Sequence, residues 1–305
     1  WLKPGWSNTK RSATLSDGEA AMQIAWSLRY LSSAIARVPL KQQNKSRLAD
    51  CRTAKASLAA ALASGYLWHL AQPVRCEQEA EPRKQVVILV RHGESEAQAR
   101  RLIGQAGDWP LTPKGVDQAR QLGLFHATAL RAAAACGHVA SSSQLRAIQT
   151  AVSALEAAGM PHEEAERVVK QKLHDGLREV HRGVVDGKSN NDPEVRRQWQ
   201  GGWARATPVE GDNRQHFRPV EGAETYDELQ QRALAALEDL LKELPGDGAT
   251  GPLWIFAHSC LIRALVWRIL GVYADLHPLN LANAAVTVIE REMRPGATWR
   301  VVEMN

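Results

Sequence analysis

Residues 85–95 read QVVILVRHGES, and this stretch decides the fold. Its first part, residues 85–90, is a continuous run of mainly β-branched residues. Such a run is typical of a buried strand in a parallel sheet, because both faces of the strand are covered. The run leads directly into Arg91 and His92. In open α/β sheets ligands collect beyond the carboxyl ends of the strands. The stretch therefore predicts a central strand with a candidate site at its end.

The same order of strand, polar end and helix recurs along the rest of the chain. The expected elements are strands at 138–141, 253–257, 285–290 and 299–303 and helices at 113–129, 144–158, 225–244 and 259–270. Alternation of strands and helices over this length predicts an α/β domain in which helices cover both faces of a largely parallel sheet. We therefore expect a three-layer α/β/α domain with a largely parallel mixed sheet over residues 84–305.

The composition excludes several protein classes. Hydrophobic residues make up 44% and charged residues 23% of the chain, which are ordinary globular values that exclude disorder throughout and fibrous folds. No stretch reaches the ~18 consecutive apolar residues of a membrane span. The four cysteines (Cys51, Cys76, Cys136 and Cys260) show neither CxxC pairs nor metal-ligand spacing. Their pattern argues against a disulfide scaffold or a zinc module and fits a reducing, intracellular compartment.

The charge is divided unevenly along the chain. Residues 1–75 contain eleven Lys or Arg and three Asp or Glu, whereas the remainder carries 27 basic and 30 acidic residues. This asymmetry predicts a separate N-terminal part, residues 1–83, that is basic, rich in Ala and Ser, and helical.

Three interpretations of residues 1–83 remain open. They are an organelle transit peptide for a mitochondrion or plastid, a helical extension packed on the domain, and a membrane anchor at 56–74. Any membrane contact is expected to run through this segment. No nucleic-acid partner is expected, because a surface of basic residues interleaved with stacking aromatics is at most weakly suggested.

Three strand ends bring polar residues to one edge of the predicted sheet: Arg91 with His92, the 141–146 segment with Arg146, and His258. Arginine side chains stay charged and match phosphate oxygens with two parallel hydrogen bonds. Their positive charge also disfavours protonation of a nearby imidazole, which leaves the ring neutral and nucleophilic. This edge therefore predicts a receptor for a phosphoryl group with an imidazole aimed at phosphorus.

At these residues the chain resembles a known family. LVRHGES at 89–95 resembles the opening motif of the histidine phosphatase superfamily, whose members are also called phosphoglycerate-mutase-like. The later motifs follow in the family order: PLTPKG at 110–115, SSQLRAIQT at 142–150, LRE at 177–179, EGAET at 221–225 and FAH at 256–258. An isolated RHG would be weak evidence, since such tripeptides arise by chance. The ordered set, which covers about residues 85–303, is strong evidence.

The resemblance implies a role for each matching residue. His92 would attack phosphorus and carry the phosphoryl group, and a backbone carbonyl near the turn would accept a hydrogen bond from its other ring nitrogen. Glu179 would protonate the leaving oxygen. The residues implied to bind the phosphoryl group or the substrate are Arg91, Arg146, His258, Ser95, Gln98 and Ser259. Gln98 and Ser259 depart from the Asn and Gly that are common in the family. No metal or cofactor is expected, and His174 and His181 are interpreted as incidental.

Further departures favour a phosphatase over a mutase. A mutase loop has Ser or Thr followed by Gly where this chain has Gly104 and Gln105. Where a mutase has a tyrosine and a lysine for its substrate, this chain has Arg182 and Asn190. Hydrolysis of a phosphomonoester, either a small molecule or a phosphoprotein, is therefore the preferred interpretation. The alternatives are a phosphoglycerate mutase-type isomerase and a catalytically weak interaction protein. The segment 188–220 is expected to cover the pocket.

Overall fold

The computed structural model describes residues 83–304, apart from 105–106, 205–215, 245–250 and 273–278. These residues belong to the compact unit Ala80–Asn305. The N-terminal segment, predicted at 1–83, lies outside the described residues except for Arg83, so its three interpretations stay predictions. None of the described helices is both long enough and apolar enough to cross a membrane.

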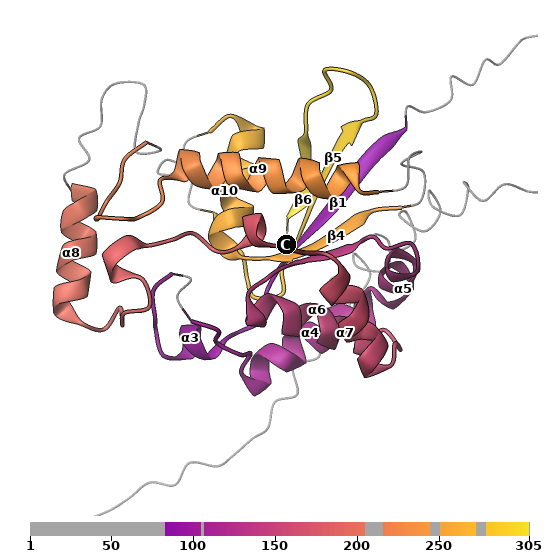
Figure 1. The fold of residues 1–305 in the computed structure, drawn as a ribbon, viewed down its shortest axis with the longest axis horizontal. Coiled ribbons are helices and arrows are strands. Elements are labelled where there is room, and N and C mark those ends of the chain that lie inside the picture. Colours follow the sequence, from indigo (N-terminus) through magenta and orange to yellow (C-terminus); the bar gives the residue numbers. More distant parts are fainter. Residues whose placement is uncertain (1–82, 105–106, 205–215, 245–250, 273–278, 305) are drawn as a thin grey trace, which may run out of the picture. The chain divides into compact units, whose positions relative to one another are not determined.

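One six-stranded sheet, in the order β3-β2-β4-β1-β5-β6, forms the centre of this unit (Figure 1). The strands are β1 (Lys84–Arg91), β2 (Val139–Ser142), β3 (Leu173–His174), β4 (Leu253–Ala257), β5 (Val286–Glu292) and β6 (Arg300–Met304). The pairs β1–β4, β2–β4 and β2–β3 are parallel, whereas β5 pairs antiparallel with both β1 and β6. The predicted α/β class with a largely parallel mixed sheet is confirmed.

Helices lie on both sides of the sheet. They are α3 (Glu96–Ala99), α4 (Pro113–Phe125), α5 (Ala127–Ala135), α6 (Leu145–Ala157), α7 (His162–Gln171), α8 (Pro193–Ala204), α9 (Tyr226–Lys242) and α10 (Ser259–Leu270). Figure 1 shows α9 and α10 along one face and α4, α5, α6 and α7 on the other side. Because β4 pairs in parallel with both β1 and β2, the carboxyl ends of these three strands lie next to one another.

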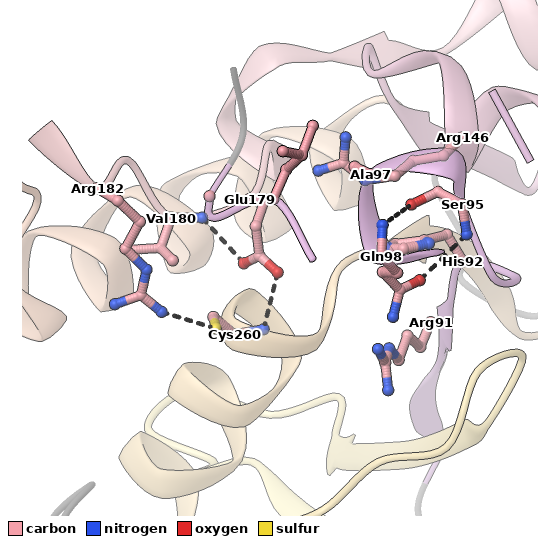
Figure 2. A pocket seen from close by; sticks show the side chains of 12 residues that line it. Arg91, His92, Ser95, Ala97, Gln98, Arg146, Glu179, Val180, Arg182 and Cys260 are labelled. Carbon is pink, nitrogen blue, oxygen red and sulfur yellow. Dashed lines mark hydrogen bonds between the residues drawn. The ribbon is translucent and has the colours of Figure 1, made fainter. Parts of the chain in front are cut away.

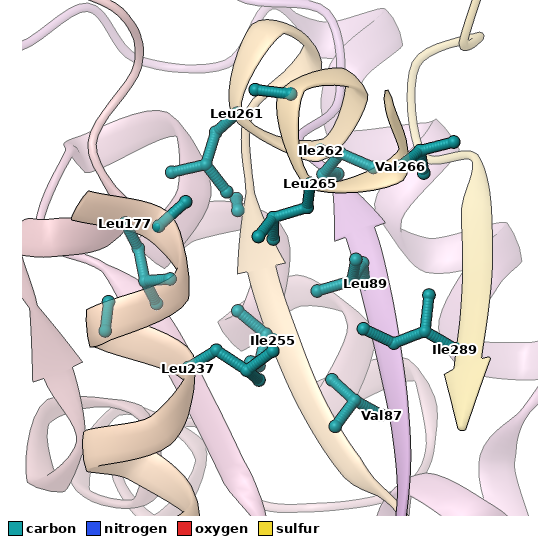
Figure 3. Packing of buried hydrophobic residues seen from close by; sticks show 14 of the residues in the cluster. Val87, Leu89, Leu177, Leu237, Ile255, Leu261, Ile262, Leu265, Val266 and Ile289 are labelled. Atoms are coloured by element: carbon teal, nitrogen blue, oxygen red, sulfur yellow. The ribbon is translucent and has the colours of Figure 1, made fainter. Parts of the chain in front are cut away.

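The core explains why β1 reads as an unbroken apolar run. Val87 and Leu89 belong to the hydrophobic cluster beneath α9 and α10, which Figure 3 shows. Ile88 and Val90 are also fully buried. They point to the opposite face, because successive side chains of a strand alternate. Both faces of β1 are therefore covered, as the β-branched run predicts.

The single helix predicted at 113–129 is wrong. The structure has two helices, α4 and α5, which meet at His126. The backbone of His126 leaves the helical region, with φ −103° and ψ 19°. Its ring, which is buried, packs edge-on against Trp254 of β4, with ring centroids 5.2 Å apart. The break turns the chain so that this ring reaches the sheet.

Four further elements, α3, α7, β3 and α8, are absent from the sequence-based expectation. Helix α8 lies inside the segment 188–220, which was expected only as a cover for the pocket. A small hydrophobic cluster holds it, in which Val195 and Trp199 accompany Val185 and Val220. This cluster is separate from the main core, so α8 is attached to the domain through a limited set of contacts.

Candidate active site

The turn after β1 fixes the orientation of His92. The backbone N–H of His92 donates to the carbonyl of Ala257 at 3.0 Å, which ties the turn to the end of β4. The ring is 4% exposed, and its Nδ1 lies 2.7 Å from the carbonyl oxygen of Gly93. Since a carbonyl oxygen only accepts, Nδ1 carries the proton and Nε2 presents a lone pair. The predicted bond to a backbone carbonyl near the turn is confirmed.

The charge state of His92 follows from its surroundings. Burial lowers the pKa of His92 to about 3, and the positive charges of Arg146 and Arg91 lower it as well. The imidazole is therefore neutral at pH 7. A neutral imidazole with a lone pair on Nε2 is the form that acts as a nucleophile.

Gly93 lets the turn approach its neighbours closely. A Cβ at this position would lie 2.4 Å from the carbonyl oxygen of Gly115. The Gly93 N–H donates to Thr150 Oγ1 at 3.0 Å, and the Thr150 hydroxyl donates to the Arg146 carbonyl at 2.7 Å. This chain of contacts fixes the turn relative to α6 and therefore relative to Arg146.

Two arginines supply the positive charge of the site. Arg146 is 3% exposed and donates from Nη2 to Gln144 Oε1 at 3.2 Å. Arg91 donates from Nη1 to the carbonyl of Leu281, while its buried Nε has no hydrogen-bond partner among the described residues. Burial lowers the pKa of each, yet a guanidinium stays protonated in proteins. Within the described residues neither forms an ion pair with a carboxylate, so the pair is available for an anion.

His258 directly follows β4, and its ring lies beside that of His92. Its ring is fully buried, and the two ring centroids are 5.1 Å apart. Nε2 of His258 lies 2.9 Å from Ser142 Oγ, whereas its buried Nδ1 has no partner among the described residues. Burial and the charge of Arg146 hold the pKa of His258 well below its ordinary value. This ring, like that of His92, is therefore neutral.

Glu179 is held over the same region by backbone donors. Its Oε1 accepts from the N–H of Val180 at 2.9 Å, and its Oε2 accepts from the N–H of Cys260 at 3.3 Å (Figure 2). Its own N–H donates to Gln144 Oε1 at 2.8 Å. Because Gln144 also bonds Arg146, one buried amide positions both the carboxylate and the guanidinium.

A cavity of about 140 Å³ joins these side chains. The residues that line it are Arg91, His92, Ser95, Ala97, Gln98, Leu102, Gly104, Arg146, Glu179, Val180, Arg182 and Cys260. Six of the eight predicted site residues are in this set. The other two are His258, whose buried ring lies beside that of His92, and Ser259, which does not line the cavity, whereas the next residue, Cys260, does. In the part of the chain that the structure describes, no cluster of three or more His, Cys, Asp or Glu suits a metal ion.

Ser95 and Gln98 stand together at the start of α3. The Ser95 hydroxyl caps the helix by accepting from the Gln98 N–H at 3.4 Å. The Gln98 side-chain oxygen accepts from the Ser95 N–H at 3.2 Å and from Asn283 Nδ2 at 2.9 Å. With its oxygen engaged, the Gln98 side chain offers its NH₂ group as a donor to a ligand.

The family model of the histidine phosphatase superfamily (branch 1) matches residues 87–305, which contain all the motifs and every residue of the site described above. The chain belongs to this superfamily. The predicted resemblance is therefore confirmed, and the strand-end histidines and arginines are found in the setting that the superfamily's motifs imply.

Relatives of this histidine phosphatase superfamily member carry both mutase and phosphatase names. A probable phosphoglycerate mutase, GpmB, of Enterobacter sp. (strain 638) is 34% identical over 226 residues, which cover 72% of this chain and 91% of the relative. A mycobacterial glucosyl-3-phosphoglycerate phosphatase is 21% identical with a TM-score of 0.52, covering 72% of this chain and 97% of that one. A phosphoglycerate mutase of Bacillus anthracis str. Sterne is 20% identical with a TM-score of 0.53, covering 74% and 95%. The two structures share the fold.

Four residues of this superfamily member were missed as site residues in the sequence: Ser142, Gln144, Arg182 and Cys260. Ser142 and Gln144 lie inside the SSQLRAIQT motif, so their place in the motif was the available signal. The sequence identifies Arg182 only as the residue that replaces the mutase tyrosine, and Cys260 only as one of the four cysteines that indicate a reducing compartment. In contrast, His174 and His181 do not line the cavity, which agrees with their interpretation as incidental.

Proposed function

We propose that the protein is a phosphomonoester phosphatase that works through a phosphohistidine on His92, with Glu179 as the proton donor. The observation that carries the proposal is the orientation of the His92 ring, whose Nδ1 is bonded to the Gly93 carbonyl. Its Nε2 has no hydrogen bond to a described residue, and the ring lines the same cavity as the guanidinium groups of Arg91 and Arg146. The nucleophilic nitrogen of His92 therefore shares the cavity with two guanidinium groups that can bind the oxygens of a phosphoryl group.

In the first step Nε2 of His92 attacks phosphorus, and the bond from phosphorus to the leaving oxygen breaks. The Glu179 carboxyl gives its proton to that oxygen, so the substrate leaves as an alcohol. Arg91 and Arg146 bind the phosphoryl oxygens and balance their charge during transfer. Phosphoryl transfer depends mainly on such positioning and electrostatic stabilisation.

In the second step a water molecule attacks the phosphohistidine. Glu179, now a carboxylate, accepts the proton of that water, and the bond from phosphorus to Nε2 breaks. The products are inorganic phosphate and the neutral ring of His92. The N–H donors of Val180 and Cys260 hold Glu179 in one place for both steps.

Two positions favour hydrolysis over mutase chemistry. Gly104 lines the cavity with φ +79°, and a Cβ there would lie 1.7 Å from Asp186 Oδ1. The Ser or Thr that a mutase has at this point would not fit without rearrangement. Asn190, at the position of the mutase lysine, does not line the cavity. Groups that would retain a phosphoglycerate are therefore lacking at both positions.

The proposal is tested by measuring phosphate release from a panel of phosphomonoesters. The panel includes p-nitrophenyl phosphate, sugar phosphates and 3-phosphoglycerate, and isomerisation of the last is followed in parallel. Wild type is compared with His92→Ala and with the control His162→Ala, which removes an exposed histidine on α7. We expect release that is lost in His92→Ala and kept in His162→Ala. Isomerisation without release would assign the protein to the mutases instead.

A further inference from the structure

His258 has one nitrogen with a partner and one without. Nε2 lies 2.9 Å from Ser142 Oγ, and Nδ1 is buried with no hydrogen-bond partner among the described residues. A buried polar atom without a partner destabilises the fold, so such an atom calls for a physical explanation, which can be a catalytic role or a bound water or ion. The nitrogen belongs to a ring whose centroid lies 5.1 Å from that of His92. A phosphoryl group on His92 would provide the missing partner.

The neutral state of His258 limits it to one N–H group. Burial and the nearby Arg146 charge keep the ring from taking a second proton at neutral pH. If the proton sits on Nε2, then Nδ1 presents a lone pair to the phosphoryl oxygens, and two acceptors face each other. If the proton sits on Nδ1, the ring donates a hydrogen bond to the phosphoryl group. The choice of tautomer therefore decides whether His258 stabilises the transferred group.

The Ser142 hydroxyl, which lies 2.9 Å from Nε2 of His258, can determine the tautomer of that ring. The backbone N–H of Gln144 donates to Ser142 Oγ at 3.3 Å, so one lone pair of the hydroxyl is engaged. The hydroxyl proton can then point to Nε2 of His258, which becomes the acceptor. Ser142 ends β2 and His258 directly follows β4; the two strands are parallel neighbours, and Ser141 pairs with Phe256 one step before the site. The sheet thus holds the serine and the histidine at a fixed separation.

We propose that Ser142 is a positioning residue that donates a hydrogen bond to Nε2 of His258 and thereby keeps the proton of that ring on Nδ1. The bond from Nδ1 to the phosphoryl group rests on the function proposed above, whereas the tautomer itself does not. Ser142 does not line the cavity. Its effect on the phosphoryl group runs through His258, in the way that an outer residue selects the tautomer of a catalytic histidine, and the tautomer measurement distinguishes this effect from its separate bond to the Gln144 N–H.

The neighbouring Ser141 offers a matched control. Both serines are fully buried at the end of β2. The hydroxyl of Ser141 donates to the backbone carbonyl of Ser142 at 3.0 Å and, within the described part of the chain, makes no hydrogen bond to His258. Ser141→Ala therefore removes the same atoms from the same strand as Ser142→Ala without touching the relay.

The test is the two-bond ¹H–¹⁵N spectrum of the full chain labelled on histidine, recorded at pH 7. A His258→Asn variant assigns the ring signals. We expect Nδ1 of His258 to be protonated in wild type, in Ser141→Ala and in Ser142→Thr, which keeps the hydroxyl. In Ser142→Ala the proton should shift wholly or partly to Nε2. Protonated Nε2 in wild type, or an unchanged tautomer in Ser142→Ala, would overturn the proposal.

Turnover of p-nitrophenyl phosphate provides the second measurement. Removing one donor to a transferring group typically costs about 10²-fold in rate. We expect Ser142→Ala to lower kcat/KM by roughly 10–100-fold and Ser142→Thr to restore most of it. A loss of activity without a tautomer change would make Ser142 structural. If the tautomer responds as expected but wild type releases no phosphate, the tautomer assignment stands and the phosphatase function fails.

Discussion

The rings of His92 and His258 lie with their centroids 5.1 Å apart, at the carboxyl ends of the adjacent parallel strands β1 and β4. Both rings are buried, and burial lowers the pKa of each, to about 3 for His92. The site therefore contains two neutral imidazoles that lie close enough to Arg146 for its charge to lower the pKa of both. This arrangement suits one ring as a nucleophile and the other as a hydrogen-bond donor to the phosphoryl group.

The low pKa of His92 predicts how stability depends on pH. The unfolded chain binds a proton at this residue below about pH 6.5, whereas the folded protein does so only near pH 3. The stabilising contribution is therefore complete above pH 6.5 and is lost as the pH falls from 6.5 towards 3. Each unit of difference between the pKa of His92 in the folded and in the unfolded protein corresponds to about 1.4 kcal/mol of folding free energy.

We expect the free energy of unfolding to rise with pH between 4 and 6.5, with a smaller slope in His92→Asn. Urea titrations at a series of pH values measure both slopes. The control is His162→Asn, which changes an exposed histidine on α7. Equal slopes for wild type and His92→Asn would argue against a buried, neutral His92.

Glu179→Gln should slow the hydrolysis of alkyl phosphates far more than that of aryl phosphates. An alkoxide is a poor leaving group that needs the proton of Glu179, whereas p-nitrophenolate leaves with little assistance. General acid catalysis contributes about 10²–10⁴-fold. We expect a loss in this range for an alkyl phosphate and below about tenfold for p-nitrophenyl phosphate. Glu163→Gln, on the exposed side of α7, is the control. Equal losses for both substrates would exclude Glu179 as the acid.

Gly93→Ala should lower both stability and activity. The new Cβ would lie 2.4 Å from the Gly115 carbonyl oxygen, and both are fixed backbone positions. Overpacking of this kind costs about 1–3 kcal/mol. Gly123→Ala creates a comparable clash, 2.1 Å from the Ala154 carbonyl oxygen, away from the site. Thermal melts should show a lower Tm for both variants. The kcat of the folded fraction should fall only for Gly93→Ala, and an equal fall in both would show that Gly93 does not position His92.

The positive charge of Arg182 in the cavity should give the protein a preference for substrates with an anionic leaving group. Its Nη2 donates to Cys260 Sγ at 3.2 Å and its guanidinium lies 4.7 Å from the centroid of the Trp199 ring. Among the described residues it forms no ion pair with a carboxylate, although it lines the cavity. A hydrogen bond to a charged group contributes about 1.5–3 kcal/mol.

We expect wild type to prefer 3-phosphoglycerate over glycerol 3-phosphate, a pair that differs in a carboxylate. In Arg182→Met this ratio of kcat/KM values should fall by roughly tenfold or more. Arg182→Lys, which keeps the charge, should retain part of the preference. An unchanged ratio in Arg182→Met would show that the arginine serves only to hold Cys260 and α8.

Much of the fold could be predicted from the sequence, because the deciding signals are local. The apolar run of β1 and the helix that follows His258 were predicted within a residue of their bounds, since buried parallel strands and their following helices have distinct patterns. The break at His126 could not be predicted, because it results from the packing of its ring on Trp254, a residue more than a hundred positions away. Helix α8 was missed because its amphipathic pattern is short and its cluster involves distant residues.

The site was predicted in its main residues because they sit in motifs at strand ends. The sequence could not show which neighbouring residues hold these side chains in position. Gln144 bonds both Arg146 and Glu179, and Cys260 rather than Ser259 reaches the cavity. These contacts depend on the turn geometry at the start of α6 and α10, which a residue pattern alone does not specify.

The phosphohistidine itself is the most direct test of the central claim. The protein is mixed with excess p-nitrophenyl phosphate, quenched within milliseconds in alkali, digested, and analysed by mass spectrometry and ³¹P NMR. Because Nδ1 of His92 is engaged by the Gly93 carbonyl, we predict phosphate on Nε2 of His92 and none in His92→Ala. Turnover with no phosphohistidine, phosphate on Nδ1, or labelling that persists in His92→Ala would contradict the account.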